Sequence, residues 1–66
     1  MVTVNVNEAD AKAIAGALVG VRLRRAQLIV DYRDQYGRFY SAEELTVVNG
    51  IGQATVEENL SRNILK

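Results

Sequence analysis

The spacing of apolar positions changes after the first few residues of the chain. Val2-Thr3-Val4-Asn5-Val6-Asn7 alternates apolar and polar residues, a period of two that is typical of extended backbone. Beyond it, apolar residues recur three or four positions apart, as in amphipathic helices. No second alternating segment is available to pair with the first. We therefore predict an extended N-terminal arm that packs Val4 or Val6 against a helical body.

The next segment predicts a short helix that ends at a glycine turn. Asp10 is a good N-cap, because its carboxylate can accept hydrogen bonds from N–H groups of the first helical turn. Ile14 and Leu18 lie four residues apart, so they share one face of a helix over residues 11–18. Val19-Gly20-Val21 then forms the turn.

The longest helix is predicted over residues 23–36. Gly37 ends it, since glycine readily adopts the left-handed conformation that often follows a helix, and Phe39 anchors the connection that comes next. Arg33 and Arg38 are expected to pair with nearby acids rather than with a ligand. The inner face of this helix is predicted to carry Leu23, Ala26, Ile29, Val30 and Arg33.

The second half of the chain predicts another pair of helices. Ser41 and Glu44 have the spacing of a capping box, which marks the start of a helix over residues 42–48. Residues 53–63 lack Gly and Pro and can form the last helix. The residues predicted to face the core are Leu45, Val48, Val56 and Leu60.

The two halves repeat the same order of features. Asp10-Ala11-Lys12-Ala13-Ile14 aligns with Ser41-Ala42-Glu43-Glu44-Leu45, and Gly20-Val21-Arg22 aligns with Gly50-Ile51-Gly52. Each half is a capped short helix, a glycine turn and a second helix. One such hairpin cannot bury its apolar face alone, but two can do so against each other. The sequence therefore predicts an all-α fold of four short helices, arranged as two hairpins with pseudo-two-fold symmetry.

Composition narrows the class of protein. The 66 residues fit one domain (1–66), with an arm over 1–9, a first hairpin over 10–36 and a second over 41–64. The absence of Cys and His excludes disulfides and the usual zinc sites. Eight basic residues balance eight acidic ones, which counts against strong non-specific binding of nucleic acid. The basic residues are nevertheless clustered, with Arg22, Arg24 and Arg25 close together.

This order of motifs resembles tandem helix-hairpin-helix domains, and more narrowly the DNA-binding domain of ComEA-type competence proteins. The resemblance covers about residues 4–64. It implies that each hairpin turn presents backbone N–H groups to a DNA phosphate without reading bases. Carried over to this chain, the contacts are Gly20 in the first turn and Gly50, Gly52, Gln53 and Ala54 in the second, with Ile51 tucked beneath. The matching segments are Val4-Asn5-Val6-Asn7, Asp10-Ala11, residues 26–33, Gly37-Arg38-Phe39, residues 41–45, Asn49-Gly50-Ile51-Gly52 and Ala54-Thr55-Val56-Glu57.

The first turn departs from the family pattern, because Arg22 stands where the family has a second glycine. If this position needs a positive φ, Arg22 is strained by about 1–3 kcal/mol; otherwise the turn has changed shape. Arg22, Arg24 and Arg25 can offer side-chain charge in place of backbone N–H groups. Positive charge opposes the dipole at a helix N-terminus, which favours a binding role for these arginines over a structural one.

The expected function is binding of double-stranded DNA through its backbone, without sequence specificity. By resemblance, this serves DNA uptake in natural transformation, in the periplasm or at the cell surface, with the cytoplasm left open. The expected partners are DNA and other DNA-uptake proteins, with no small-molecule substrate, and the chain is expected to be a monomer. No cofactor is expected; a monovalent cation at a hairpin turn, under Gly50, is left open.

Two other functions remain open at this point. Zero net charge, together with Glu57 and Glu58 beside the second turn, fits a protein-interaction or scaffold module that has lost DNA binding. The chain also fits a fragment of a larger nuclease or DNA repair protein. Catalysis by the chain itself is not expected, because no nucleophile, metal-ligand cluster or pocket for a flipped base is evident in so few residues. A Gly52→Arg change is expected to weaken phosphate binding sharply.

Overall fold

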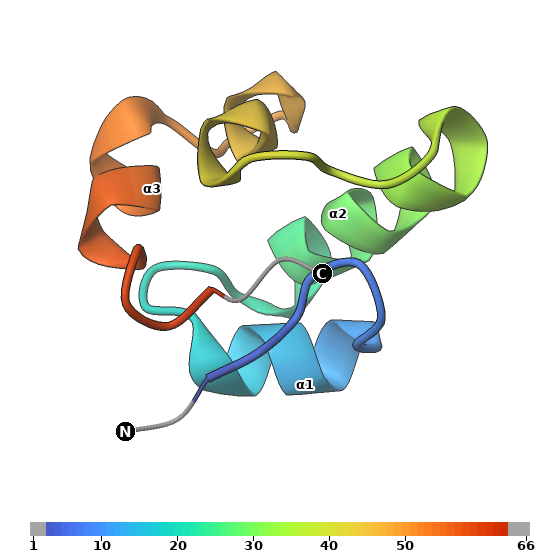
Figure 1. The fold of residues 1–66 in the computed structure, drawn as a ribbon. Helices are drawn as coiled ribbons and strands as arrows, with labels where there is room; N and C mark the ends of the chain where they lie inside the picture. Colours follow the sequence, from blue (N-terminus) through green and yellow to red (C-terminus); the bar gives the residue numbers. More distant parts are fainter. Residues whose placement is uncertain (1–2, 64–66) are drawn as a thin grey trace.

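The computed structural model describes residues 3–63, and within this range the chain forms four helices (Figure 1). Its only strand-like pairing there is a single parallel bridge between Val4 and Asn63. The all-α prediction is confirmed. The helices are α1 (Ala11–Ala17), α2 (Leu23–Tyr36), η1 (Ala42–Val47) and α3 (Gln53–Glu58), of which η1 is a 3₁₀-helix.

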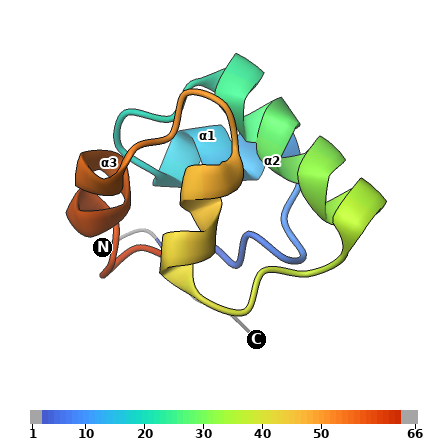
Figure 2. The same ribbon diagram turned by 90° about the horizontal axis from the view of Figure 1, so that it is seen from above.

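The helices pair as two hairpins that share one core (Figure 2). α1 packs on α2, and η1 packs on α3. Phe39, Ile14, Ile29 and Val6 are the largest fully buried side chains, and they come from the arm, both helices of the first hairpin and the connection between hairpins. Because this cluster also contains Leu45, Val48, Ile51 and Val56 of the second hairpin, its burial explains how two short hairpins without disulfides can hold together. The other core residues are Val4, Ala11, Ala17, Leu18, Val21, Ala26, Leu45, Val48, Ile51 and Val56.

The 3₁₀ geometry of η1 explains why the second half is one residue shorter between its apolar anchor and its glycine. In the first hairpin, the N–H of Leu18 donates to Ile14, four residues back, at 3.0 Å. In the second, the N–H of Val48 donates to Leu45, three residues back, at 3.0 Å. A 3₁₀ turn contains fewer residues than an α turn. The tighter helix therefore brings the second chain segment to an equivalent turn with one residue less.

The predicted helix starts are correct in position, but one cap differs in detail. Asp10 caps α1, with its Oδ1 accepting from the N–H of Ala13 at 2.8 Å. Ser41 precedes η1 but makes no side-chain capping bond. Glu44 instead accepts from the N–H of Tyr40 at 3.0 Å, so the predicted reciprocal capping box is wrong. In the tighter 3₁₀ turn the third residue lies nearly over the cap, and its side chain reaches one residue further back.

The predicted end of the last helix is also wrong. α3 ends at Glu58, and turns follow over residues 59–62. Leu60, which was expected to face the core, is 52% exposed, whereas Asn59 is 2% exposed. The side chain of Asn59 donates to the carbonyl of Thr55, four residues back, which is the acceptor that the N–H of Asn59 would use in a continued α-helix. Leu23, which was predicted on the inner face of its helix, is the first residue of α2 and is 54% exposed. Residue 64, the last of the predicted second hairpin, lies outside the described residues.

The N-terminal arm is held by Arg33 and packs into the core as predicted. Val6 is fully buried, and Nη1 of Arg33 donates to the carbonyls of Val6 at 2.7 Å and Ala9 at 2.6 Å. Arg33 also lies 3.7 Å from Asp34, so its predicted pairing with an acid is only its secondary contact. Arg38 pairs with no acid within residues 3–63; it lies over the ring of Tyr40, 5.6 Å from its centre.

Candidate nucleic-acid interface

The two hairpin turns have the same backbone shape. Gly20 and Gly50 both have positive φ, 77° and 88°, a region that favours glycine. Two residues later, Arg22 has φ −87° and ψ 173°, and Gly52 has φ −99° and ψ 175°. This later position is ordinary extended backbone that any residue adopts. Arg22 is therefore unstrained and the first turn is unchanged in shape, so both alternatives inferred from the sequence are wrong.

The second turn leaves several backbone N–H groups free. Gly52 is the N-cap residue of α3, and no side chain caps the N–H groups at the start of this helix. In the range 3–63, the N–H groups of Gly50, Gly52, Gln53 and Ala54 donate to no protein acceptor. These residues are also exposed. The second turn can therefore offer hydrogen-bond donors to an external oxygen, as the resemblance implied.

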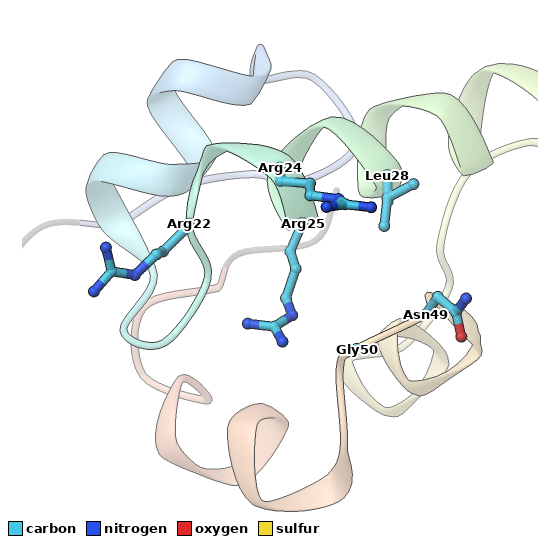
Figure 3. A pocket seen from close by; sticks show the side chains of 6 residues that line it. All are labelled: Arg22, Arg24, Arg25, Leu28, Asn49 and Gly50. Atoms are coloured by element: carbon cyan, nitrogen blue, oxygen red, sulfur yellow. The ribbon is translucent and has the colours of Figure 1, made fainter.

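A groove of about 410 Å³ lies between the start of α2 and the second turn (Figure 3). Arg24 points toward Leu28 and Arg25 points toward the segment that carries Gly50, whereas Arg22 points away from Gly50 and Leu28 (Figure 3). The groove thus combines the arginines of one hairpin with the turn of the other. Its lining residues are Arg22, Arg24, Arg25, Leu28, Asn49 and Gly50.

The charge in this groove is not neutralised by neighbouring acids. Within the described part of the chain, the only ion pair joins Arg33 to Asp34, and Arg22, Arg24 and Arg25 are all exposed. Arginine presents several N–H donors in a planar fork that matches phosphate and carboxylate oxygens. The groove is therefore suited to an anion.

Arg25 crosses between the two hairpins. A β-carbon on Gly50 would lie 2.5 Å from Nε of Arg25 and 3.2 Å from its Cδ, so a side chain at position 50 would displace the flexible end of Arg25. At the first turn, a β-carbon on Gly20 would meet Cγ2 of Thr55 at 4.0 Å. Each turn is thus approached by a residue of the other hairpin, but only one of these residues is charged.

The structure gathers half of the predicted site residues and leaves the others outside the groove. Arg22, Arg24, Arg25 and Gly50 line it together. Gly20, Gly52, Gln53 and Ala54 are exposed but do not line it, and their predicted contact with DNA stays a prediction.

Sequence reasoning missed Leu28, Asn49 and Asn59. Leu28 follows Arg24 by four positions, a helical spacing that indicates a shared face. Asn59 follows Val56 by three positions and so belongs to the inward face of the last helix. A polar residue at such a position is a signal for a buried hydrogen-bonding role. For Asn49, only its place beside Gly50 gave a hint.

Metal-ligand groups and membrane-spanning helices can be sought directly in the described residues. Within residues 3–63, no group of three or more acidic side chains could hold a metal ion. The expectation of no cofactor, and the open question of a monovalent cation under Gly50, stay predictions. Among the described helices, none has the length and apolar character needed to cross a bilayer.

Comparison with known proteins places the chain among relatives of several kinds. It is 45% identical over 60 residues to an uncharacterized protein of Haemophilus influenzae, covering 91% of this chain and 54% of that protein. It is 38% identical over 55 residues to ComE operon protein 1 of Bacillus subtilis, covering 83% of this chain and 26% of that protein. This similarity confirms the resemblance to ComEA-type proteins. No solved structure gives a significant match.

A third relative is named for an endonuclease/exonuclease/phosphatase family domain. The chain is 39% identical over 54 residues to endonuclease/exonuclease/phosphatase family domain-containing protein 1 of Xenopus laevis, covering 82% of this chain and 10% of that protein. The chain therefore spans about half the length of one relative and a much smaller part of the other two. Residues 1–62 match the family described as "Helix-hairpin-helix motif". With two equivalent hairpins in its structure and a match over nearly its whole length, the chain belongs to the helix-hairpin-helix family.

Proposed function

We propose that this chain binds double-stranded DNA through its sugar-phosphate backbone, without reading the base sequence. One observation carries the proposal: Arg22, Arg24 and Arg25 line a groove together with Gly50 and have no acidic partner within residues 3–63. A phosphate is the anion that a helix-hairpin-helix turn is expected to bind, and the unpaired guanidinium groups supply charge-assisted hydrogen bonds to it.

The groove also has an apolar wall. Leu28 is 37% exposed and lies next to Arg24 (Figure 3). A nucleotide unit has a charged phosphate beside the C–H groups of its sugar. Arginines next to an exposed leucine therefore match the backbone of DNA better than they match a small inorganic anion. None of these contacts distinguishes one base from another, which supports binding without sequence specificity.

The proposed biological role is DNA uptake during natural transformation, at the cell surface or in the periplasm. The resemblance to ComEA-type competence proteins, supported by 38% identity to ComE operon protein 1, favours this role. The partners would be DNA and other DNA-uptake proteins, and the module would act as a monomer without catalysis, a small-molecule substrate or a cofactor.

A titration of labelled duplex DNA tests the proposal. Fluorescence anisotropy at about 20 mM salt should show binding, with equal affinity for duplexes of unrelated sequence. The logarithm of the affinity should fall with the logarithm of salt concentration, with a slope of about −0.9 for each phosphate contacted. Absence of binding even at this low salt concentration would contradict the proposal.

Two alternatives have observations in their favour. Glu57 and Glu58 are exposed on α3, which suits a scaffold module with a protein partner. The match to the Xenopus protein named for an endonuclease/exonuclease/phosphatase domain suits a module within a larger DNA-processing protein. DNA binding by the isolated chain separates the first alternative from the proposal. The natural length of the gene product separates the second.

A further inference from the structure

The contact between Arg25 and Gly50 joins the two hairpins at the candidate interface. Arg25 is the third residue of α2, in the first hairpin, and Gly50 is the central residue of the second turn. A β-carbon on Gly50 would lie 2.5 Å from Nε of Arg25. The arginine therefore lies directly over the backbone of a turn that carries free N–H groups.

The pseudo-two-fold symmetry of the chain relates this contact to another one. Arg25 follows Gly20 by five residues, and Thr55 follows Gly50 by five residues. Thr55 is the third residue of α3 and approaches Gly20, whose β-carbon would meet its Cγ2 at 4.0 Å. The two turns are thus covered in the same way by the opposite hairpin. One cover is a guanidinium and the other is a neutral side chain.

We infer that one DNA phosphate is bound jointly by the two hairpins, between the Arg25 guanidinium and the Gly50 turn, and that the Gly20–Thr55 side is a weaker copy. This inference rests on the proposed function and specifies its dominant contact. The planar guanidinium presents paired donors to phosphate oxygens. Because Gly50 has no β-carbon, both the guanidinium and the phosphate can come close to the backbone of the turn.

The surrounding charges support the difference between the two sides. Arg22 and Arg24 line the same groove as Arg25, and none of the three has an acidic partner within the described range. At the first turn the neighbour of the would-be β-carbon of Gly20 is Thr55, a neutral side chain. The Arg25–Gly50 side therefore offers more positive charge to a phosphate than the Gly20–Thr55 side.

A double-mutant cycle tests the joint contact. Arg25→Thr places at position 25 the residue found at the related position 55 and removes the guanidinium. Gly50→Ala places a β-carbon where Arg25 lies and displaces it. Gly20→Ala is the matched control, because Gly20 has a similar positive φ and hence a similar backbone cost, but its β-carbon would meet nothing closer than 4.0 Å.

The expected result is coupling between positions 25 and 50 alone. Gly50→Ala should weaken duplex binding about fivefold in the wild type and less than about twofold in the Arg25→Thr background, because the contact is already lost there. Gly20→Ala should have the same small effect in both backgrounds. Equal effects of Gly50→Ala in both backgrounds, or coupling of equal size for Gly20→Ala, would overturn the inference.

A second comparison avoids the glycine substitutions and their effect on folding. Arg25→Thr should weaken duplex binding about tenfold and make the salt slope shallower by about 0.9. Arg38→Thr removes the same charge from a residue that lies over Tyr40 and should leave the slope unchanged. Equal losses for both would show a general effect of charge and overturn the joint site. Failure of the wild type to bind DNA would overturn the proposed function as well.

Discussion

The side chain of Asn59 hydrogen-bonds both backbone groups of Val19, forty residues away in the other hairpin. Its Oδ1 accepts from the N–H of Val19 at 2.7 Å, and its Nδ2 donates to the carbonyl of Val19 at 2.8 Å. Nδ2 also donates to the carbonyl of Thr55 at 2.8 Å. One buried carboxamide therefore fixes the first turn against the end of α3, and so sets the position of Gly20 relative to Thr55.

Asn59→Ala should lower the free energy of unfolding by about 1–3 kcal/mol, because it leaves polar groups at this junction without partners. Urea unfolding measures the loss, and faster amide exchange at Val19 would locate it. Asn49→Ala is the matched control, since Asn49 is exposed and should change stability by less than about 0.5 kcal/mol. Equal stability of the two variants would contradict the role given to Asn59.

Arg33 should be one of the main attachments of the N-terminal arm, together with Asn7, whose side chain makes two hydrogen bonds to the backbone of Phe39. Arg33→Met removes the donor to the carbonyls of Val6 and Ala9 while keeping most of the apolar stem, and should cost about 1–3 kcal/mol of stability. Proteolysis or amide exchange should then show the arm opening before the rest of the chain. The control is Arg38→Met, which removes an exposed arginine and should leave the arm protected. Similar opening of the arm in both variants would refute this assignment.

Substitution by alanine should change the stability of the protein differently at the two glycines of the second turn. Gly50 has φ 88°, so Gly50→Ala should lose about 1 kcal/mol or more of stability from backbone strain alone. Gly52 has φ −99° and open space around its would-be β-carbon, so Gly52→Ala should stay within about 0.5 kcal/mol of the wild type. Thermal unfolding of both variants measures the difference. A larger loss for Gly52→Ala would contradict the positive φ of Gly50 and the extended backbone of Gly52.

Much of this fold follows from local sequence signals. Asp10 caps a helix, the positive φ of Gly20 and Gly50 requires glycine, and the repeat of these features predicts two hairpins that bury each other. Each of these signals depends on residues a few positions apart, where backbone sterics and hydrogen bonding decide the outcome. They gave the order of the helices and the location of both turns.

The interface itself depends on contacts that no local pattern contains. Arg25 and Gly50 meet only because the hairpins pack with pseudo-two-fold symmetry, and Asn59 reaches Val19 for the same reason. The predicted helix over residues 53–63 rested on the absence of Gly and Pro, and that local signal could not show that the Asn59 side chain takes the carbonyl of Thr55 as its acceptor. The sequence predicted charge in one half and free N–H groups in the other; the packing of the hairpins brings the two into one groove.

Gly52→Arg should strengthen DNA binding, contrary to the expectation from sequence. That expectation assumed a glycine-specific backbone at this position, but Gly52 and Arg22 have nearly the same φ and ψ. A β-carbon at Gly52 would meet nothing within 4 Å. The variant should therefore fold with unchanged stability and place an arginine in the second turn at the position equivalent to Arg22 in the first. We expect affinity for duplex DNA to rise about threefold, with a salt slope steeper by about 0.9 if the new arginine reaches one phosphate.

Gly16→Arg is the control that separates a local contact from a change in net charge. Gly16 lies in α1, is exposed and also has nothing within 4 Å of its would-be β-carbon, so the same charge is added away from the groove. Anisotropy titrations over a range of salt concentrations should show a steeper slope for Gly52→Arg alone. Equal slopes would mean that only net charge matters. Weaker binding by a folded Gly52→Arg variant would mean that phosphate must approach the backbone of Gly52 itself, which would restore the contact that the family resemblance implied.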